Sequence, residues 1–318
     1  MPAMHLIIPY AAPSSQGFAA ALTHLKLPNL QKLLSRLTPG PLDSGDEFSL
    51  SPPHERALAA ALSLSAPDGC IPWAALRAHQ SGQTDSANSA WAFITLCHWQ
   101  VNTGHVAMSQ LPLPALSDAQ SAALLKAMRP YFEEDGITLY FDEPGRWLAH
   151  GEVFAGLATA SPDRVVGRNL AAWMTTSAQA APLRRLQNEM QMLLYTHPVN
   201  DAREAMNLTP VNSFWLHGSG TLPAAYQPAP ANAQPVVLDT LKPLALTDDW
   251  QGWAQAWQAL DAGDIQQRLQ TAAAGQTVQL TLCGERSSQT WTAEPQPVWQ
   301  KFKGLFGSQP LSMLLEKL

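Results

Sequence analysis

The residues that could hold a metal ion or attack a substrate are scattered along the sequence. Nine histidines are present, but no HExxH or HxH pair, GxSxG pattern or phosphate-binding P-loop occurs. His98 and His105 fall in a predicted hairpin and could face each other. Because no carboxylate stands near them, a structural pair is favoured over a metal site.

One glycine-rich element follows a predicted strand, in the stretch Trp215-Leu216-His217-Gly218-Ser219-Gly220. Glycines allow backbone N–H groups to approach a ligand closely, and such concave backbone segments favour anions. A tight turn after the strand explains the same residues. The element is therefore a candidate anion site, with a turn as the alternative.

Charge and composition restrict the class of partner. The 318 residues include 19 Lys and Arg against 25 Asp and Glu, a net charge of −6. This balance argues against nucleic acid and against an anionic membrane as partners, because both need basic surfaces. The sequence has neither a signal-peptide pattern nor an apolar run long enough to cross a bilayer, so we expect a cytoplasmic protein. Cys70, Cys97 and Cys283 show no disulfide or CxxC spacing, which predicts free thiols.

Hydrophobic spacing predicts strands and helices in alternation. We expect strands at 5–8, 92–101, 105–108, 137–141, 146–149, 211–216, 236–238 and 278–283, and helices at 17–25, 28–37, 54–62, 118–128, 183–195 and 249–269. Residues 38–46 and 226–234 are predicted loops. Strands separated by helices indicate an α/β fold. We expect a core of residues 1–84 and 176–318, and a small inserted α+β cap subdomain at 85–175.

Four segments resemble the alkaline-phosphatase superfamily, and within it the archaeal-type cofactor-independent phosphoglycerate mutases. They are Leu27 to Leu33 (LPNLQKL), His197 to Arg203 (HPVNDAR), Thr209 to Gly220 (TPVNSFWLHGSG) and Leu280 to Ser288 (LTLCGERSS). The whole chain is also similar to bacterial regulatory proteins of the RpfE type, through Cys97-His98-Trp99, His105-Val106 and Leu186 to Asn200. The resemblance implies an alkaline-phosphatase-like core sheet flanked by helices, with the cap inserted into it.

The departures from that pattern bear on function. In the superfamily, two metal ions held by Asp and His activate a Ser or Thr nucleophile. The first metal-binding Asp is replaced by the stretch Pro9-Tyr10-Ala11, and the late Asp-His pair by Gly284-Glu285-Arg286. The substrate-binding Arg is replaced by His217, which binds phosphate less well than a bidentate Arg. One carboxylate cannot hold two divalent ions.

Three hypotheses follow. The first is a non-catalytic, phosphoglycerate mutase-like regulatory protein without cofactor or metal, which binds a protein partner or a small anionic ligand. The second is a metal-dependent phosphotransfer enzyme, a mutase or phosphatase, with rearranged ligands, for which the candidates are Asp46, His98, His105, Asp239 and Glu285. The third is a module that retains the old pocket and binds an anion, with His217 tuning it by pH. Its candidate residues are Asn200, Arg203, Asn212, His217, Gly218, Ser219 and Gly220.

Structural roles compete with these. Asn200 and Arg203 could tie the end of a helix to the following strand, and this reading is favoured over ligand binding. The loop 224–235 and the apolar stretch 305–315 could form a partner surface, although we expect the amphipathic segment 312–318 to dock on its own domain.

Overall fold

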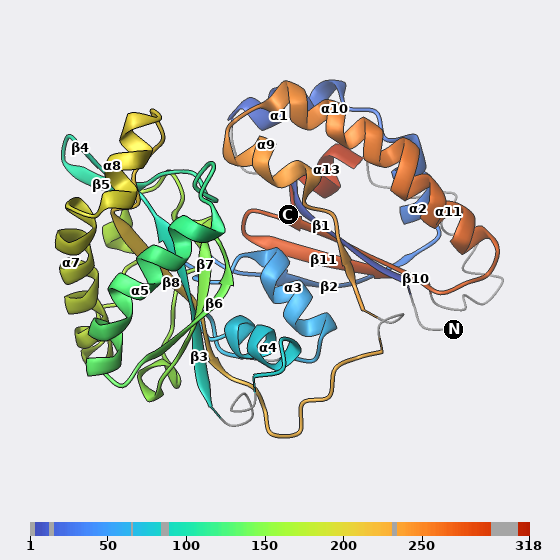
Figure 1. Cartoon of the computed structure of the whole chain (residues 1–318). Coiled ribbons are helices and arrows are strands. Elements are labelled where there is room, and N and C mark those ends of the chain that lie inside the picture. Colours follow the sequence, from blue (N-terminus) through green and yellow to red (C-terminus); the bar gives the residue numbers. More distant parts are fainter. Residues whose placement is uncertain (1–3, 13–15, 65, 84–88, 231–233, 294–310) are drawn as a thin grey trace. The chain divides into compact units, whose positions relative to one another are not determined.

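The computed structural model describes residues 4–12, 16–64, 66–83, 89–230, 234–293 and 311–318. These form two compact units (Figure 1). The first contains Met1–Phe48, Pro52–Ser63 and Pro228–Leu318, and the second contains Ser49–Ser51 and Leu64–Gln227. Among the described residues, every helix is too short or too polar to cross a bilayer.

The first unit is built on a five-stranded sheet. Its strands are β1 (Met4–Ala12), β2 (Thr38–Ser44), β9 (Val236–Val237), β10 (Val278–Gly284) and β11 (Ser287–Thr292), in the order β2-β11-β10-β1-β9. β1 runs parallel to both β10 and β9, whereas β10, β11 and β2 pair antiparallel. The sheet is therefore mixed, with β1 and β10 as its parallel centre.

Helices cover both faces of this sheet. They are α1 (Gln16–His24), α2 (Pro28–Leu34), α3 (Pro53–Ala61), α9 (Lys242–Leu246), α10 (Trp250–Leu260), α11 (Gln266–Ala273) and α13 (Leu311–Leu315), with a π-helical turn at Asp261–Ile265 and a 3₁₀ turn at Asp239–Leu241. Figure 1 draws α3 on the opposite side of the sheet from α10 and α11, and α3 packs on β1, β10 and β11. On the α10 side, Leu6, Ile8 and Leu280 join Trp253 and Trp257 in one buried cluster.

A buried carboxylate caps α2 from a distant part of the chain. The residue before α2, Leu27, has no side chain able to cap it. Instead, Asp261 accepts hydrogen bonds from the N–H groups of Asn29 (3.2 Å) and Leu30 (2.7 Å). Two of the unpaired N–H groups of the first helical turn are thereby satisfied. The LPNL segment is fixed by the π-helical turn that supplies Asp261.

The second unit is an α+β structure with an antiparallel sheet. Its strands are β3 (Ala90–Cys97), β6 (Thr138–Glu143), β7 (Arg146–His150) and β8 (Ser213–Thr221), in the order β6-β7-β3-β8, and a separate hairpin joins β4 (Trp99–Asn102) to β5 (His105–Met108). The α-helices are α4 (Trp73–Gln80), α5 (Asp118–Glu134), α6 (Pro162–Val165), α7 (Ala181–Tyr195) and α8 (Pro198–Ala205), with 3₁₀ turns at Glu152–Phe154, Leu170–Ala172 and Ala178–Ala180.

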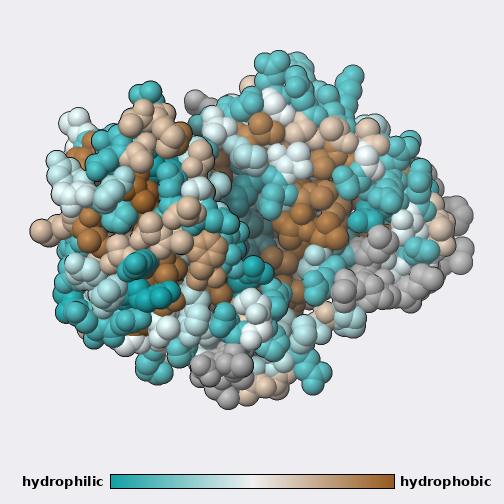
Figure 2. Space-filling view, viewed as in Figure 1, coloured by the Kyte–Doolittle hydropathy of each residue, from teal (hydrophilic) through white to brown (hydrophobic). Residues whose placement is uncertain are grey.

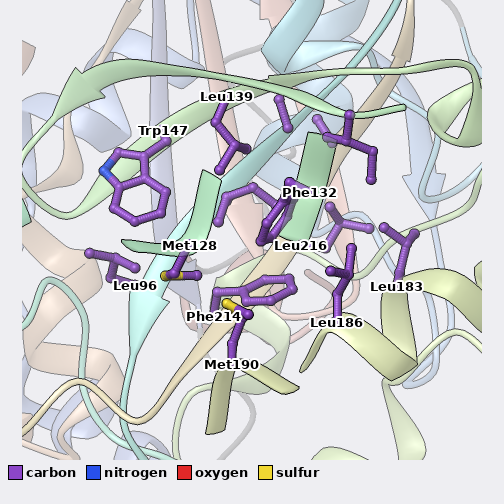
Figure 3. Packing of buried hydrophobic residues seen from close by; sticks show 14 of the residues in the cluster. Leu96, Met128, Phe132, Leu139, Trp147, Leu183, Leu186, Met190, Phe214 and Leu216 are labelled. Atoms are coloured by element: carbon purple, nitrogen blue, oxygen red, sulfur yellow. The ribbon is translucent and has the colours of Figure 1, made fainter. Parts of the chain in front are cut away.

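The core of the second unit lies between its sheet and helices α5 and α7 (Figure 3). Alternate residues of the strands, such as Leu96, Trp147 and Phe214, meet Met128 of α5 and Met190 of α7. The opposite face of the sheet is covered by α4, which packs on β3, β7 and β8. Both faces of the second sheet are thus occupied.

The mixed α/β class and a core sheet flanked by helices are confirmed. Several local expectations are wrong. Residues 38–46 are not a loop: 38–44 form edge strand β2, where Pro39 and Pro41 are tolerated because one side lacks a partner strand. The helix predicted at 118–128 continues to Glu134 through Pro130. The strand predicted at 211–216 continues through the glycine-rich stretch to Thr221.

The boundaries of the two compact units also differ from those of the expected cap, 85–175. The second unit takes in 64–84 and 176–227 as well, because β8 pairs with β3 and α7 covers the same sheet. An insertion limited to 85–175 stays a prediction.

A half-buried histidine in the first unit generates a prediction about pH. His5 Nε2 lies 2.7 Å from Thr281 Oγ1, which lies 2.7 Å from Thr290 Oγ1, so one polar chain links three strands. Burial lowers the pKa of His5 below the ordinary 6.5. The unfolded chain therefore binds a proton at a pH where the folded chain does not, and the free energy of unfolding falls as the pH drops below about 6.5.

We expect His5→Asn to reduce this loss of stability between pH 7 and 5, measured by urea unfolding at several pH values. His24→Asn, at an exposed position on α1, is the matched control and should leave the pH dependence as in the parent chain. An unchanged slope in His5→Asn would contradict the assignment.

Candidate functional site

Asn200 connects two segments of main chain. Its side-chain amide donates to the carbonyls of Leu194 (2.8 Å) and Val211 (2.7 Å), and its Oδ1 accepts from the N–H of Val211 (2.8 Å). The side chain is buried. Asn200 therefore ties the end of α7 to the segment that leads into β8.

Arg203 is a fully buried cation with neutral partners. Its guanidinium donates to the carbonyls of Thr209 (2.8 Å) and Pro114 (2.9 Å), with longer bonds to the Ala115 carbonyl and Gln120 Oε1. Its exposed fraction is 0%, and burial lowers its pKa. Because these bonds hold α8 to the chain before α5, an external anion could reach the guanidinium only after rearrangement.

Asn212 and His197 also bond to main chain. Asn212 exchanges two hydrogen bonds with the backbone of Trp99, at 2.7 and 2.9 Å, and so fixes the start of β4. His197 Nδ1 accepts from the N–H of Val199 and caps α8. The HPVN motif thus ends α7 and begins a helix that hydrophobic spacing did not reveal.

The glycine-rich stretch lies within β8 and packs closely on its neighbours. A Cβ at Gly218 would lie 3.0 Å from Phe93 and 3.1 Å from Trp73, and one at Gly220 would lie 3.0 Å from the Cys70 carbonyl. Ser219 is buried and donates to the Leu157 carbonyl. A side chain at position 218 or 220 would therefore collide with α4 or with the chain before it. Close packing accounts for both glycines.

His217 is half-buried and lies beside a charged cluster. Its Nε2 lies 2.8 Å from Thr95 Oγ1, and its ring packs 5.2 Å from that of Phe93. The guanidinium of Arg146 lies 4.5 Å above the Phe93 ring. Phe93 therefore has a histidine and an arginine packed against its ring.

A single buried carboxylate orients this cluster. Asp142 is bound by Arg77 at 2.7 Å and by Arg146 at 2.8 Å, and its side chain is 2% exposed. We call Arg77, Asp142, Arg146 and His217 the cationic cluster. The sequence pattern revealed neither arginine, and the strand predicted at 137–141 ended one residue before Asp142.

In the first unit, the carboxyl ends of β1 and β10 lie side by side, with Ala12 opposite Gly284. The Tyr10 carbonyl accepts a hydrogen bond from the indole of Trp253 (3.0 Å), and the Ala11 carbonyl accepts one from Trp257 (3.2 Å). These two tryptophans are fully buried. Their indoles satisfy main-chain oxygens at the place where the resemblance puts a metal-binding Asp.

The neighbouring β10 end carries a thiol and a hairpin turn. Burial raises the pKa of the Cys283 thiol far above its ordinary value, so it is protonated at neutral pH. Arg286, in the turn, pairs with Glu47 at 3.2 Å. The three cysteines are free, as expected, with Cys97 and Cys283 buried and Cys70 half-buried.

The five alternative metal-binding candidates occupy different environments. In the first unit, Asp46 accepts from the N–H of Phe48, Asp239 begins an exposed 3₁₀ turn, and Glu285 lies in the turn between β10 and β11. In the second unit, His98 donates from Nδ1 to the Pro210 carbonyl, while His105 is exposed and pairs with Asn102.

The idea that His98 and His105 face each other is wrong. His98 accepts from the N–H of Ser109 at the open end of the β4–β5 hairpin, and His105 lies at its turn.

Comparisons with known proteins found only distant similarity. The chain matches no protein-family model and no curated protein. It is similar to a cofactor-independent phosphoglycerate mutase from Thermoplasma acidophilum, with 13% identity, 92% of this chain and 89% of that chain covered, and a TM-score of 0.37. It is also similar to the PH0037 protein from Pyrococcus horikoshii, with 13% identity, 92% and 88% coverage, and a TM-score of 0.43. With such TM-scores, neither likeness carries an argument about activity.

The buried arginine gives a prediction. Arg203→Gln should lower the free energy of unfolding by about 2–4 kcal/mol, because it leaves buried carbonyls without donors. Arg185→Gln, at an exposed position on α7, breaks a surface pair with Asp135 and should cost far less, because solvent screens exposed ion pairs. Urea unfolding of both variants measures this. Equal small losses would contradict a structural role for Arg203.

Proposed function

We propose that this chain is a non-catalytic, phosphoglycerate mutase-like regulatory protein that lacks the two-metal site and binds a small anionic ligand or a protein partner. The regulatory part of the proposal follows from the resemblance of the sequence to regulatory proteins of the RpfE type. The sequence segments that resemble archaeal-type mutases, above all the two motifs in 197–220, motivate it.

The observation that carries the proposal is the chemistry at the carboxyl ends of β1 and β10. Ligands of α/β sheets bind outside these ends. Here the strand ends carry Tyr10-Ala11-Ala12 and Cys283-Gly284, and the carbonyls of Tyr10 and Ala11 accept from tryptophan indoles. Two divalent ions would need several carboxylate or imidazole ligands each. The residues at these two strand ends do not fit that requirement.

Metal content tests this directly. Protein purified without chelators should contain fewer than two equivalents of zinc or manganese by elemental mass spectrometry. It should also show no phosphoglycerate mutase turnover with added manganese. Two tightly held equivalents, or turnover abolished by Asp239→Ala, would refute the proposal and favour the enzyme alternative.

Anion binding is the second part of the proposal, and the cationic cluster supports it. Arg77 and Arg146 share the buried carboxylate of Asp142, and their side chains stay 44% and 30% exposed, so both can still meet an anion beside His217. Glu143, 55% exposed, lies 3.3 Å from Arg146 and balances the remaining positive charge. By contrast, Asn200, Arg203 and Asn212 are engaged with main chain, so we assign ligand contact to His217 rather than to them.

We expect 3-phosphoglycerate or inorganic phosphate in excess to raise the melting temperature by about 2–5 °C, since a ligand selective for the folded state stabilises it. Arg146→Gln should remove this rise, whereas Arg185→Gln should retain it. Sodium chloride at equal ionic strength controls for screening. A rise of the same size in all three proteins would contradict binding at the cationic cluster.

A further inference from the structure

Residues 311–318 occupy the carboxyl ends of β1 and β10. A Cβ at Gly284 would lie 2.3 Å from the main-chain carbon of Leu318 and 2.8 Å from the carbonyl oxygen of Ala12. Only a residue without a side chain leaves room for the segment beside β10. The segment therefore lies where α/β sheets receive their ligands.

Main-chain and apolar contacts together hold the segment. The Leu318 carbonyl accepts a hydrogen bond from the N–H of Ser287, at 3.0 Å. Leu311, Leu315 and Leu318 are 7%, 1% and 9% exposed and join the buried cluster of the first unit. The expectation that 312–318 docks on its own domain is confirmed, while 305–310 lie outside the described residues.

The spacing of the leucines is that of an amphipathic helix. Positions 311, 315 and 318 fall at i, i+4 and i+7, on one helical face. Met313, 49% exposed, points away from the cluster, and Glu316 and Lys317 are exposed. In Figure 2, apolar surface gathers on the first unit just below the place where Figure 1 draws α13.

A helix as short as α13 has little stability of its own, because helix nucleation is unfavourable. Its order must come from the surface that receives the leucines. Amphipathic helices bind apolar grooves in this way, through anchors at these spacings.

We propose that the crevice at the carboxyl ends of β1 and β10 is a groove for an amphipathic helical segment with leucines at its first, fifth and eighth positions. Residues 311–318 fill it as an intramolecular ligand, which a protein partner bearing the same pattern displaces. The inference rests on the proposed function in that a groove holding two metal ions could not accept this segment.

Hydrogen exchange of the full chain gives the first test. The amides of Ser287 and of residues 316–318 are hydrogen-bonded when the segment is docked. They should exchange at least a hundredfold faster than those of Leu280 and Leu282, with rates independent of low urea, because only the segment opens. Exchange of both sets at one rate, through global unfolding, would overturn the proposal.

A peptide test identifies the occupant. A chain truncated after position 310 should unfold cooperatively and bind a labelled peptide of residues 311–318, LSMLLEKL. The full chain should bind it at least tenfold more weakly, because its own segment competes. The same peptide with Leu315→Asp should not bind. No binding by the truncated chain, or loss of its cooperative unfolding, would overturn the proposal. The metal measurement above is a separate readout, so failure of either idea is distinguishable.

Discussion

The parallel pairing of β1 with β10 is the constraint on which the first unit depends. It brings Ala12 and Gly284 together at one edge, where two chain segments otherwise far apart end side by side. In an enzyme, such an edge must stay open and polar. Here the Trp253 and Trp257 indoles bond the carbonyls of β1, and residues 311–318 fill the space beside Gly284. Apolar packing and main-chain hydrogen bonds thus occupy this end of the sheet.

In the second unit, polar side chains likewise form hydrogen bonds to the main chain. Asn200, Arg203 and Asn212 each bond backbone atoms of other chain segments. Unpaired buried carbonyls and N–H groups destabilise a fold, so such side chains are needed wherever irregular chain is buried. In this chain the three side chains therefore serve the fold. The cationic cluster differs, because its arginines remain partly exposed.

Local patterns predicted local structure well. The face formed by Leu186, Met190 and Leu194 predicted α7, and the helix expected from 118 begins there, capped by Ser117. Patterns failed where long-range partners decide. Thr38–Ser44 is a strand because β11 pairs with it, not because of its own residues. No local signal links Asp261 to the start of α2, or Arg203 to Pro114, since these partners lie far apart in sequence. For the same reason, the sequence could not predict the cationic cluster or the position of Leu318, because their partners meet only in the folded chain.

The central claim is that the carboxyl ends of β1 and β10 hold a segment of the chain itself in place of two metal ions. Crystals grown with manganese and measured near its absorption edge test it most directly. The account predicts no anomalous peak at the carboxyl ends of β1 and β10. It also predicts that the Leu318 carbonyl lies within hydrogen-bond distance of the Ser287 N–H. Two anomalous peaks beside Ala12 and Gly284, bound by carboxylate or imidazole groups, would contradict it.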